Sequence, residues 1–81
     1  MELKETIEMM NSEDYKERFK GEYYQVKIRF EKLNIMIGKY ETGTLDFTPK
    51  CSLPILKNQL TIMKQYIKIL ERRAEIERIE L

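Results

Sequence analysis

Tyrosines stand beside lysines and arginines at several places in this chain of 81 residues. The groups are Tyr15 with Lys16 and Arg18, Tyr23 and Tyr24 with Lys20 and Lys27, Tyr40 with Lys39, and Tyr66 with Lys64 and Lys68. Aromatic rings stack on nucleobases, and neighbouring cations pair with phosphates. The pattern indicates a site for a small anionic nucleotide. The residues expected to form it are Tyr15, Lys20, Tyr24, Lys27, Arg29 and Lys39.

The same residues also have a purely structural interpretation, which the sequence leaves open. Tyr23 and Tyr40 fit a helix core, and Tyr24 and Tyr66 fit a subunit interface, with the lysines forming a solvated face. Cys51 likewise fits a packed or idle thiol in a loop, because nothing nearby in the sequence would lower its pKa.

Catalytic and metal chemistry have little support in the composition. The chain has no histidine, one cysteine and three glycines. A zinc site of known spacing, a Cys–His nucleophile and a glycine-rich phosphate loop are therefore all excluded. We expect neither an enzyme nor a bound metal or cofactor.

The net charge of +1 conceals a segmental pattern. Residues 1–15 total −4, residues 16–40 total +4, residues 41–52 total −1 and residues 53–81 total +2. A general nucleic-acid binder needs a broad basic face, which such a balance disfavours. A compact anion held by a few converging lysines remains compatible with it.

Two long amphipathic helices must position these residues. Apolar residues alternate at steps of four and three from Phe19 to Tyr40 and again from Leu56 to Leu81. The predicted fold class is therefore all-α, an antiparallel helical hairpin in one domain spanning residues 1–81. Its expected elements are a short helix over 2–10, a long helix over 13–37, a loop over 38–52 and a long helix over 53–79.

Each long helix carries a second apolar line, which one packing partner cannot cover. In the first helix the line contains Tyr24, Ile28 and Ile35; in the second it follows strict heptad spacing. Its members are Ile55, Ile62, Ile69 and Ile76. A chain this short has a marginal core, so the second lines predict assembly into a homo-oligomeric bundle.

Two local features have alternative interpretations. Gly21 lies inside the first long helix and fits a tolerated helix glycine, with a bend or a close contact to another backbone as the alternative. The loop of 15 residues is long for a hairpin, and we expect Leu45 and Phe47 to fold down over its open end.

Nothing in the sequence indicates a membrane or an export signal. No apolar run approaches the ~20 residues needed to span a bilayer, and glutamates occupy the first ten residues. A lone cysteine fits a reducing compartment. We expect a protein of a host cytoplasm with no membrane partner.

A further set of residues resembles small helical-hairpin proteins of tailed phages, including crAss-like phages. The resemblance covers about residues 15–74 and includes Glu22-Tyr23, Arg29, Lys32-Leu33, Met36-Ile37, Leu56, Gln59-Leu60, Met63, Tyr66, Leu70, Arg72 and Arg73. It implies a phage origin and a hairpin fold. In size and architecture the chain also looks like the phage sponges of anti-CBASS and anti-Thoeris type, and no residue role is carried over from them.

Together these features predict a phage counter-defence protein that holds a small cyclic nucleotide immune signal between subunits without cleaving it. The alternative is a helical oligomerisation or adaptor protein whose second apolar line receives a helix from a host or phage partner.

Overall fold

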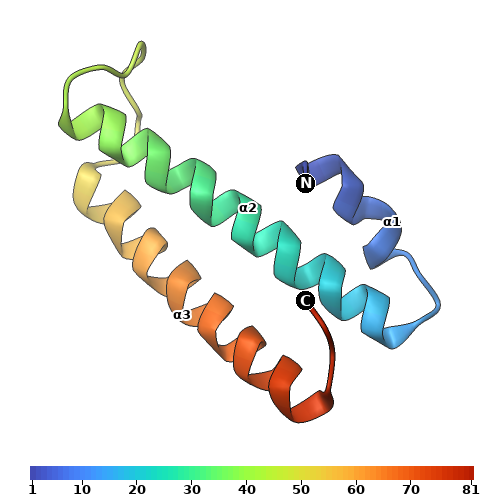
Figure 1. Cartoon of the computed structure of the whole chain (residues 1–81). Coiled ribbons are helices and arrows are strands. Elements are labelled where there is room, and N and C mark those ends of the chain that lie inside the picture. Colours follow the sequence, from blue (N-terminus) through green and yellow to red (C-terminus); the bar gives the residue numbers. More distant parts are fainter.

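The computed structural model describes all 81 residues and confirms the predicted all-α class. A 3₁₀ turn, Leu3–Glu5, leads into a short helix α1, Thr6–Met10. Two long helices follow, α2 over Tyr15–Glu41 and α3 over Leu53–Glu77, and they form the antiparallel hairpin of Figure 1. None of these helices has the length and hydrophobicity of a transmembrane span.

The ends of α2 follow from its capping residues. Asp14 is the N-cap, and its carboxylate accepts a hydrogen bond from the Lys16 amide at 3.0 Å. The helix passes through Gly38 and ends at Glu41, four residues beyond the predicted end at Ile37. A glycine inside a helix costs only about 1 kcal/mol relative to alanine, so Gly38 does not stop it. The chain turns at Gly43, where φ is +74°.

Different local features determine where helix α3 begins and where it ends. Ser52 precedes it in an extended conformation, and Pro54 lies in the first turn, where a missing amide hydrogen costs little. At the other end Arg78 adopts the left-handed conformation with φ of 57°. The Ile79 amide then bonds the Ala74 carbonyl at 2.9 Å, and the Ile79 side chain enters the core. The predicted helix to residue 79 is therefore two residues too long.

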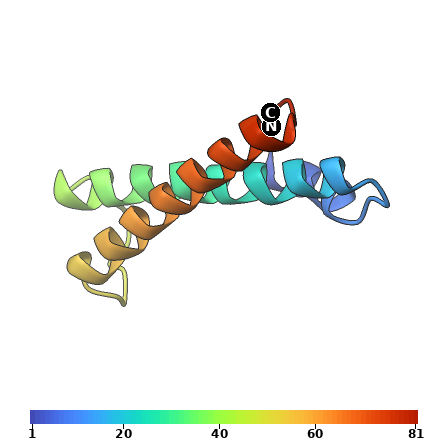
Figure 2. The ribbon, with the colours of Figure 1, turned by 90° about the horizontal axis from the view of Figure 1, so that it is seen from below.

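The two long helices cross obliquely, as Figure 2 shows. The main core lies where they pass, towards the C-terminal half of α3. Its buried members are Phe19, Tyr23, Val26, Ile67, Leu70, Ala74 and Ile79. The two predicted lines of apolar residues, Phe19 to Tyr40 on α2 and Leu56 to Leu81 towards the C-terminus, face each other there. The last member of each line, Tyr40 or Leu81, is exposed. The assignment of Tyr40 to the core is therefore wrong, because α2 and α3 have diverged at that end.

Helix α1 packs on α2 at Gly21. A Cβ at this position would lie 2.8 Å from Met10 Cγ and 2.9 Å from the Met10 backbone nitrogen. The interpretation of Gly21 as merely a tolerated helix glycine is thus wrong, and the alternative of a close backbone contact is confirmed. Thr6 of the same short helix is fully buried and donates its hydroxyl to the Leu3 carbonyl at 2.7 Å.

The loop between α2 and α3 does not close the hairpin as predicted. Leu45 is half-buried, but Phe47 is 55% exposed. Ile37 of α2 and Leu56 of α3 are buried near this end of the hairpin without a contribution from Phe47. The expectation that Phe47 folds down over the open end is therefore wrong.

The second apolar line of α3 lies entirely on the surface. Ile55, Ile62, Ile69 and Ile76 are 57% to 65% exposed. On α2 the corresponding line is divided: Tyr24 and Ile28 are half-buried beneath the N-terminal segment, whereas Ile35 is exposed. One subunit therefore leaves a long apolar strip on α3 without a cover.

Candidate functional site

Three tyrosines join the two long helices through glutamates. The Tyr23 hydroxyl donates to Glu71 at 2.7 Å, the Tyr15 hydroxyl donates to Glu77 at 2.6 Å, and the Tyr66 hydroxyl donates to Glu22. Burial, followed by the bond to Glu71, raises the pKa of Tyr23 to about 12. These hydroxyls therefore bond within the hairpin. The bonds hold the three rings in place and limit their ability to stack on the base of a nucleotide.

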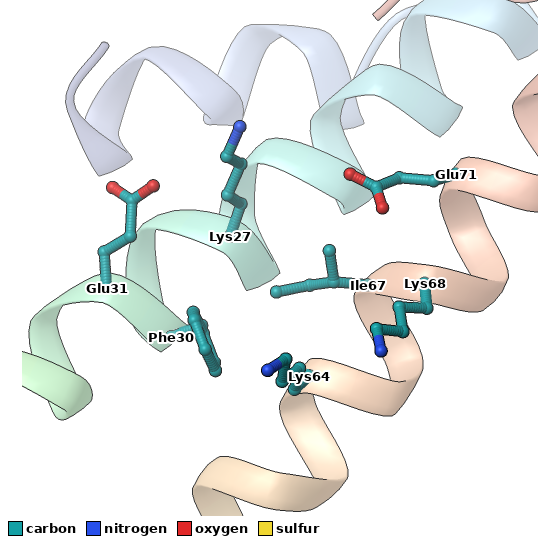
Figure 3. A pocket seen from close by; sticks show the side chains of 7 residues that line it. All are labelled: Lys27, Phe30, Glu31, Lys64, Ile67, Lys68 and Glu71. Atoms are coloured by element: carbon teal, nitrogen blue, oxygen red, sulfur yellow. The ribbon is translucent and has the colours of Figure 1, made fainter.

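A groove opens between α2 and α3 beside the Tyr23–Glu71 bond, and we call it the α2–α3 groove (Figure 3). It encloses about 200 Å³. Its lining residues are Lys27, Phe30, Glu31, Lys64, Ile67, Lys68 and Glu71. Phe30 and Ile67 form the apolar floor, Lys64 and Lys68 lie beside it on α3, and Lys27 and Glu31 extend from α2 with their charged ends directed towards the N-terminal segment.

The three lysines of the groove are free to bind an external anion. None of them is within ion-pair distance of a carboxylate, whereas Lys4, Lys20 and Lys57 each have such a partner. Lys27 lies over the Tyr23 ring with its ammonium nitrogen 5.7 Å from the ring centre. Glu71 is occupied by the Tyr23 hydroxyl. Charge-assisted contacts from such lysines are the strong class of hydrogen bond to a phosphate.

A second hollow of about 200 Å³ adjoins the groove on the other side of Lys27 and Glu31. Tyr24, Ile28 and Met1 complete its lining. The Tyr24 ring is packed edge-on to Tyr23, with ring centres 5.1 Å apart. Lys27 therefore stands between an apolar groove and a hollow that contains a tyrosine ring.

The structure brings together only two of the six predicted site residues. Tyr24 and Lys27 line the second hollow. Tyr15 lies at the far end of the hairpin, where its hydroxyl bonds Glu77 and also accepts from Arg73 at 2.9 Å. Lys20 pairs with Glu17 at 3.4 Å.

Arg29 and Lys39 are exposed on α2 and line neither hollow. The predicted set thus does not form one site in a single subunit. The physical reason is that its members face different directions around α2 or lie along much of its length.

Sequence reasoning missed Lys64 and Lys68 as members of the site. They lie four residues apart on α3 and flank Ile67, so that helical spacing places both at the edge of the buried seam. This spacing could have indicated from the sequence that both lysines border the contact between the two long helices. Their approach to Lys27 and Phe30, however, depends on where α3 crosses α2, which local sequence does not specify.

Comparison with known proteins relates the chain to a family. The family model described as Sequestin matches residues 13–76, which is 64 of the 81 residues and includes every lining residue of the α2–α3 groove. No curated protein and no solved structure matches the chain.

Proposed function

This chain belongs to the Sequestin family, and from that membership and the α2–α3 groove we propose that it binds and sequesters a small anionic ligand. The family name suggests sequestration of a molecule, and so a binding protein rather than a catalyst. We propose further that the ligand is a cyclic nucleotide immune signal, held without cleavage in the cytoplasm of a phage-infected host.

The observation that carries the proposal is the set of three unpaired lysines around an apolar floor. Lys64 and Lys68 approach the groove from α3, and Lys27 stands on its α2 side. A nucleotide combines phosphates with a flat base, which matches cations set beside Phe30 and Ile67. Each charge-assisted contact contributes roughly 1.5–3 kcal/mol, so two contacts and one packed base support micromolar or tighter binding.

The size of the groove supports a ligand that is shared between subunits. A pocket that buries most of a small organic ligand usually encloses about 300–1,000 Å³. The groove encloses about 200 Å³ and is open to one side. We propose that a second subunit covers the exposed part of the ligand and so slows its release.

Retention of a ligand through filtration tests the proposal directly. The protein is incubated with cyclic dinucleotides, cyclic trinucleotides and cyclic ADP-ribose derivatives, filtered, and then denatured by heat. We expect one of these to be released intact only after heating. Degraded ligand would indicate an enzyme, and retention of none would favour the adaptor alternative, in which the apolar strip of α3 binds a protein helix.

Substitutions in the groove test the site itself. Lys64→Ala with Lys68→Ala should weaken binding of the retained nucleotide at least tenfold, because two cations that contact phosphate are lost. Lys32→Ala is the matched control, since Lys32 is an exposed lysine of α2 outside both hollows. Calorimetry measures both. Equal losses in the two variants would show that the groove is not the binding site.

A further inference from the structure

The exposed strip of α3 defines a surface that has no counterpart elsewhere on the chain. Ile55, Ile62, Ile69 and Ile76 repeat every seven residues over three heptads, a distance of about 32 Å along the helix. Between Ile55 and Ile69 the residues beside them on this face are Asn58, Gln59, Gln65 and Tyr66. None of these side chains carries a charge. In a chain with 36% charged residues, a helix face that stays uncharged over the two heptads from Ile55 to Ile69 is typical of a helix–helix interface.

We propose that this face pairs with the same face of a second copy, with the two α3 helices antiparallel and a two-fold axis between Gln65 and Tyr66. In this register Ile62 faces Ile69 of the other copy, and Ile55 faces Ile76. The interface is self-complementary, as a two-fold contact requires, because each isoleucine meets another isoleucine.

The charges at the end of α3 determine the orientation. Within α3, Arg72 and Arg73 are the charged residues that lie three or four positions from these isoleucines, and both lie towards the C-terminal end. In a parallel pair, four guanidinium groups would gather at one end. In the antiparallel pair Arg72 approaches Asn58 of the other copy, whose amide oxygen accepts hydrogen bonds from guanidinium. The bond of Arg72 to Glu75 leaves it further N–H donors for this contact. Arg73 is instead directed towards α2, where it bonds Glu77 and Tyr15 and lies over the Phe19 ring.

The pairing does not rest on the proposed ligand. Taking about 100° per residue, Lys64 and Lys68 point roughly 120–160° away from Ile62 around α3. The α2–α3 groove and the isoleucine face are thus on opposite sides of this helix. A second copy seated on the isoleucines does not reach the groove, so the subunit proposed to cover the ligand would use a different contact, and failure of either proposal can be recognised without the other.

The mass of the protein in solution is the first test. Light scattering at micromolar concentration should give an even number of subunits, and Ile62→Glu with Ile69→Glu should halve the mass. Ile35→Glu, on α2, is the matched control, because Ile35 is equally exposed at 59%. It should leave the α3 pair intact. Circular dichroism should show unchanged helicity in every variant, so that a lower mass of the assembly cannot be attributed to unfolding.

Disulfide trapping tests the orientation in a Cys51→Ser background. In the antiparallel register Asn58 lies beside Arg72 of the other copy, so a mixture of Asn58→Cys and Arg72→Cys proteins should cross-link under mild oxidation. Asn58→Cys alone should not, because its two copies lie about 21 Å apart and a disulfide needs Cα atoms within about 7 Å. A monomer, an odd number of subunits, an assembly that survives the glutamates, or cross-linking by Asn58→Cys alone would overturn the proposal.

Discussion

Individual tyrosines in this protein act mainly through their hydroxyl groups. Tyr15, Tyr23 and Tyr66 each bond a glutamate of the facing helix, and in each case that bond raises the pKa of the tyrosine. For Tyr23 burial is the larger cause, whereas for the other two the hydrogen bond is. Most of the tyrosines beside lysines, whose rings were expected to stack on a nucleotide, thus join the helices of the hairpin. Tyr24 is the exception, because it lines the second hollow.

The raised pKa of Tyr23 predicts a loss of stability at alkaline pH. Its value is about 12 in the folded protein against 10.0 for the free side chain, so the unfolded chain loses its proton first as the pH rises. The contribution of Tyr23 to the free energy of unfolding should be constant below pH 10 and fall between pH 10 and 12. Tyr15 and Tyr66 contribute in the same direction.

Urea titrations at several pH values measure this effect. Tyr23→Phe should flatten the decline, because the largest contributing group is removed. Tyr40→Phe is the control, since Tyr40 is exposed and its hydroxyl has no hydrogen-bond partner in the hairpin. A decline of equal steepness in Tyr23→Phe and the unchanged protein would contradict the assignment.

At the scale of elements, the fold depends on two different kinds of helix contact. Helices α2 and α3 meet through large side chains such as Phe19 and Leu70, which is 1% exposed. Helix α1 meets α2 through the absence of a side chain at Gly21, where the two backbones approach closely. A helix of five residues has little stability of its own, so α1 depends on this contact.

Alanine substitutions at two glycines of α2 should therefore have opposite effects. Gly21→Ala should destabilise the protein by about 1–3 kcal/mol, because its Cβ would overlap the Met10 backbone. Gly38→Ala is the matched control: nothing lies within 4 Å of its Cβ, and better helix propensity should stabilise by up to about 1 kcal/mol. Thermal melts compare the two, and stabilisation by Gly21→Ala would show that α1 does not pack as described.

At the scale of the whole molecule, opposite sides of α3 carry different kinds of surface. The side towards α2 bears the groove lysines, and the outward side bears the isoleucines. Ligand binding at the first surface is proposed to be electrostatic in large part, and self-association at the second is proposed to be apolar. The two proposed activities should therefore respond differently to salt.

Raising the ionic strength from about 0.1 M to 1 M shortens the screening length from about 10 Å to 3 Å. We expect binding of the retained nucleotide to weaken progressively over this range, with the mass of the assembly unchanged or increased. Calorimetry and light scattering on the same samples measure the two quantities. Dissociation of the assembly by salt would contradict an interface made by isoleucines.

The sequence by itself determined the all-α class, the two helix seams and the exposed isoleucine line of α3, because these follow from the spacing of apolar residues along each helix. It also offered a close backbone contact as one alternative for Gly21, although the spacing alone did not select it. Only the tertiary structure decided where α3 crosses α2.

That crossing determines the candidate site. It places Lys64 and Lys68 opposite Lys27 and Phe30, bonds Tyr15 to Glu77 and leaves Arg29 and Lys39 outside both hollows. It also brings Ile79 back into the core after the left-handed turn at Arg78. Heptad spacing shows which face of a helix is buried but not the angle or register at which two such faces meet. Residues far apart in sequence converge only when that geometry is known.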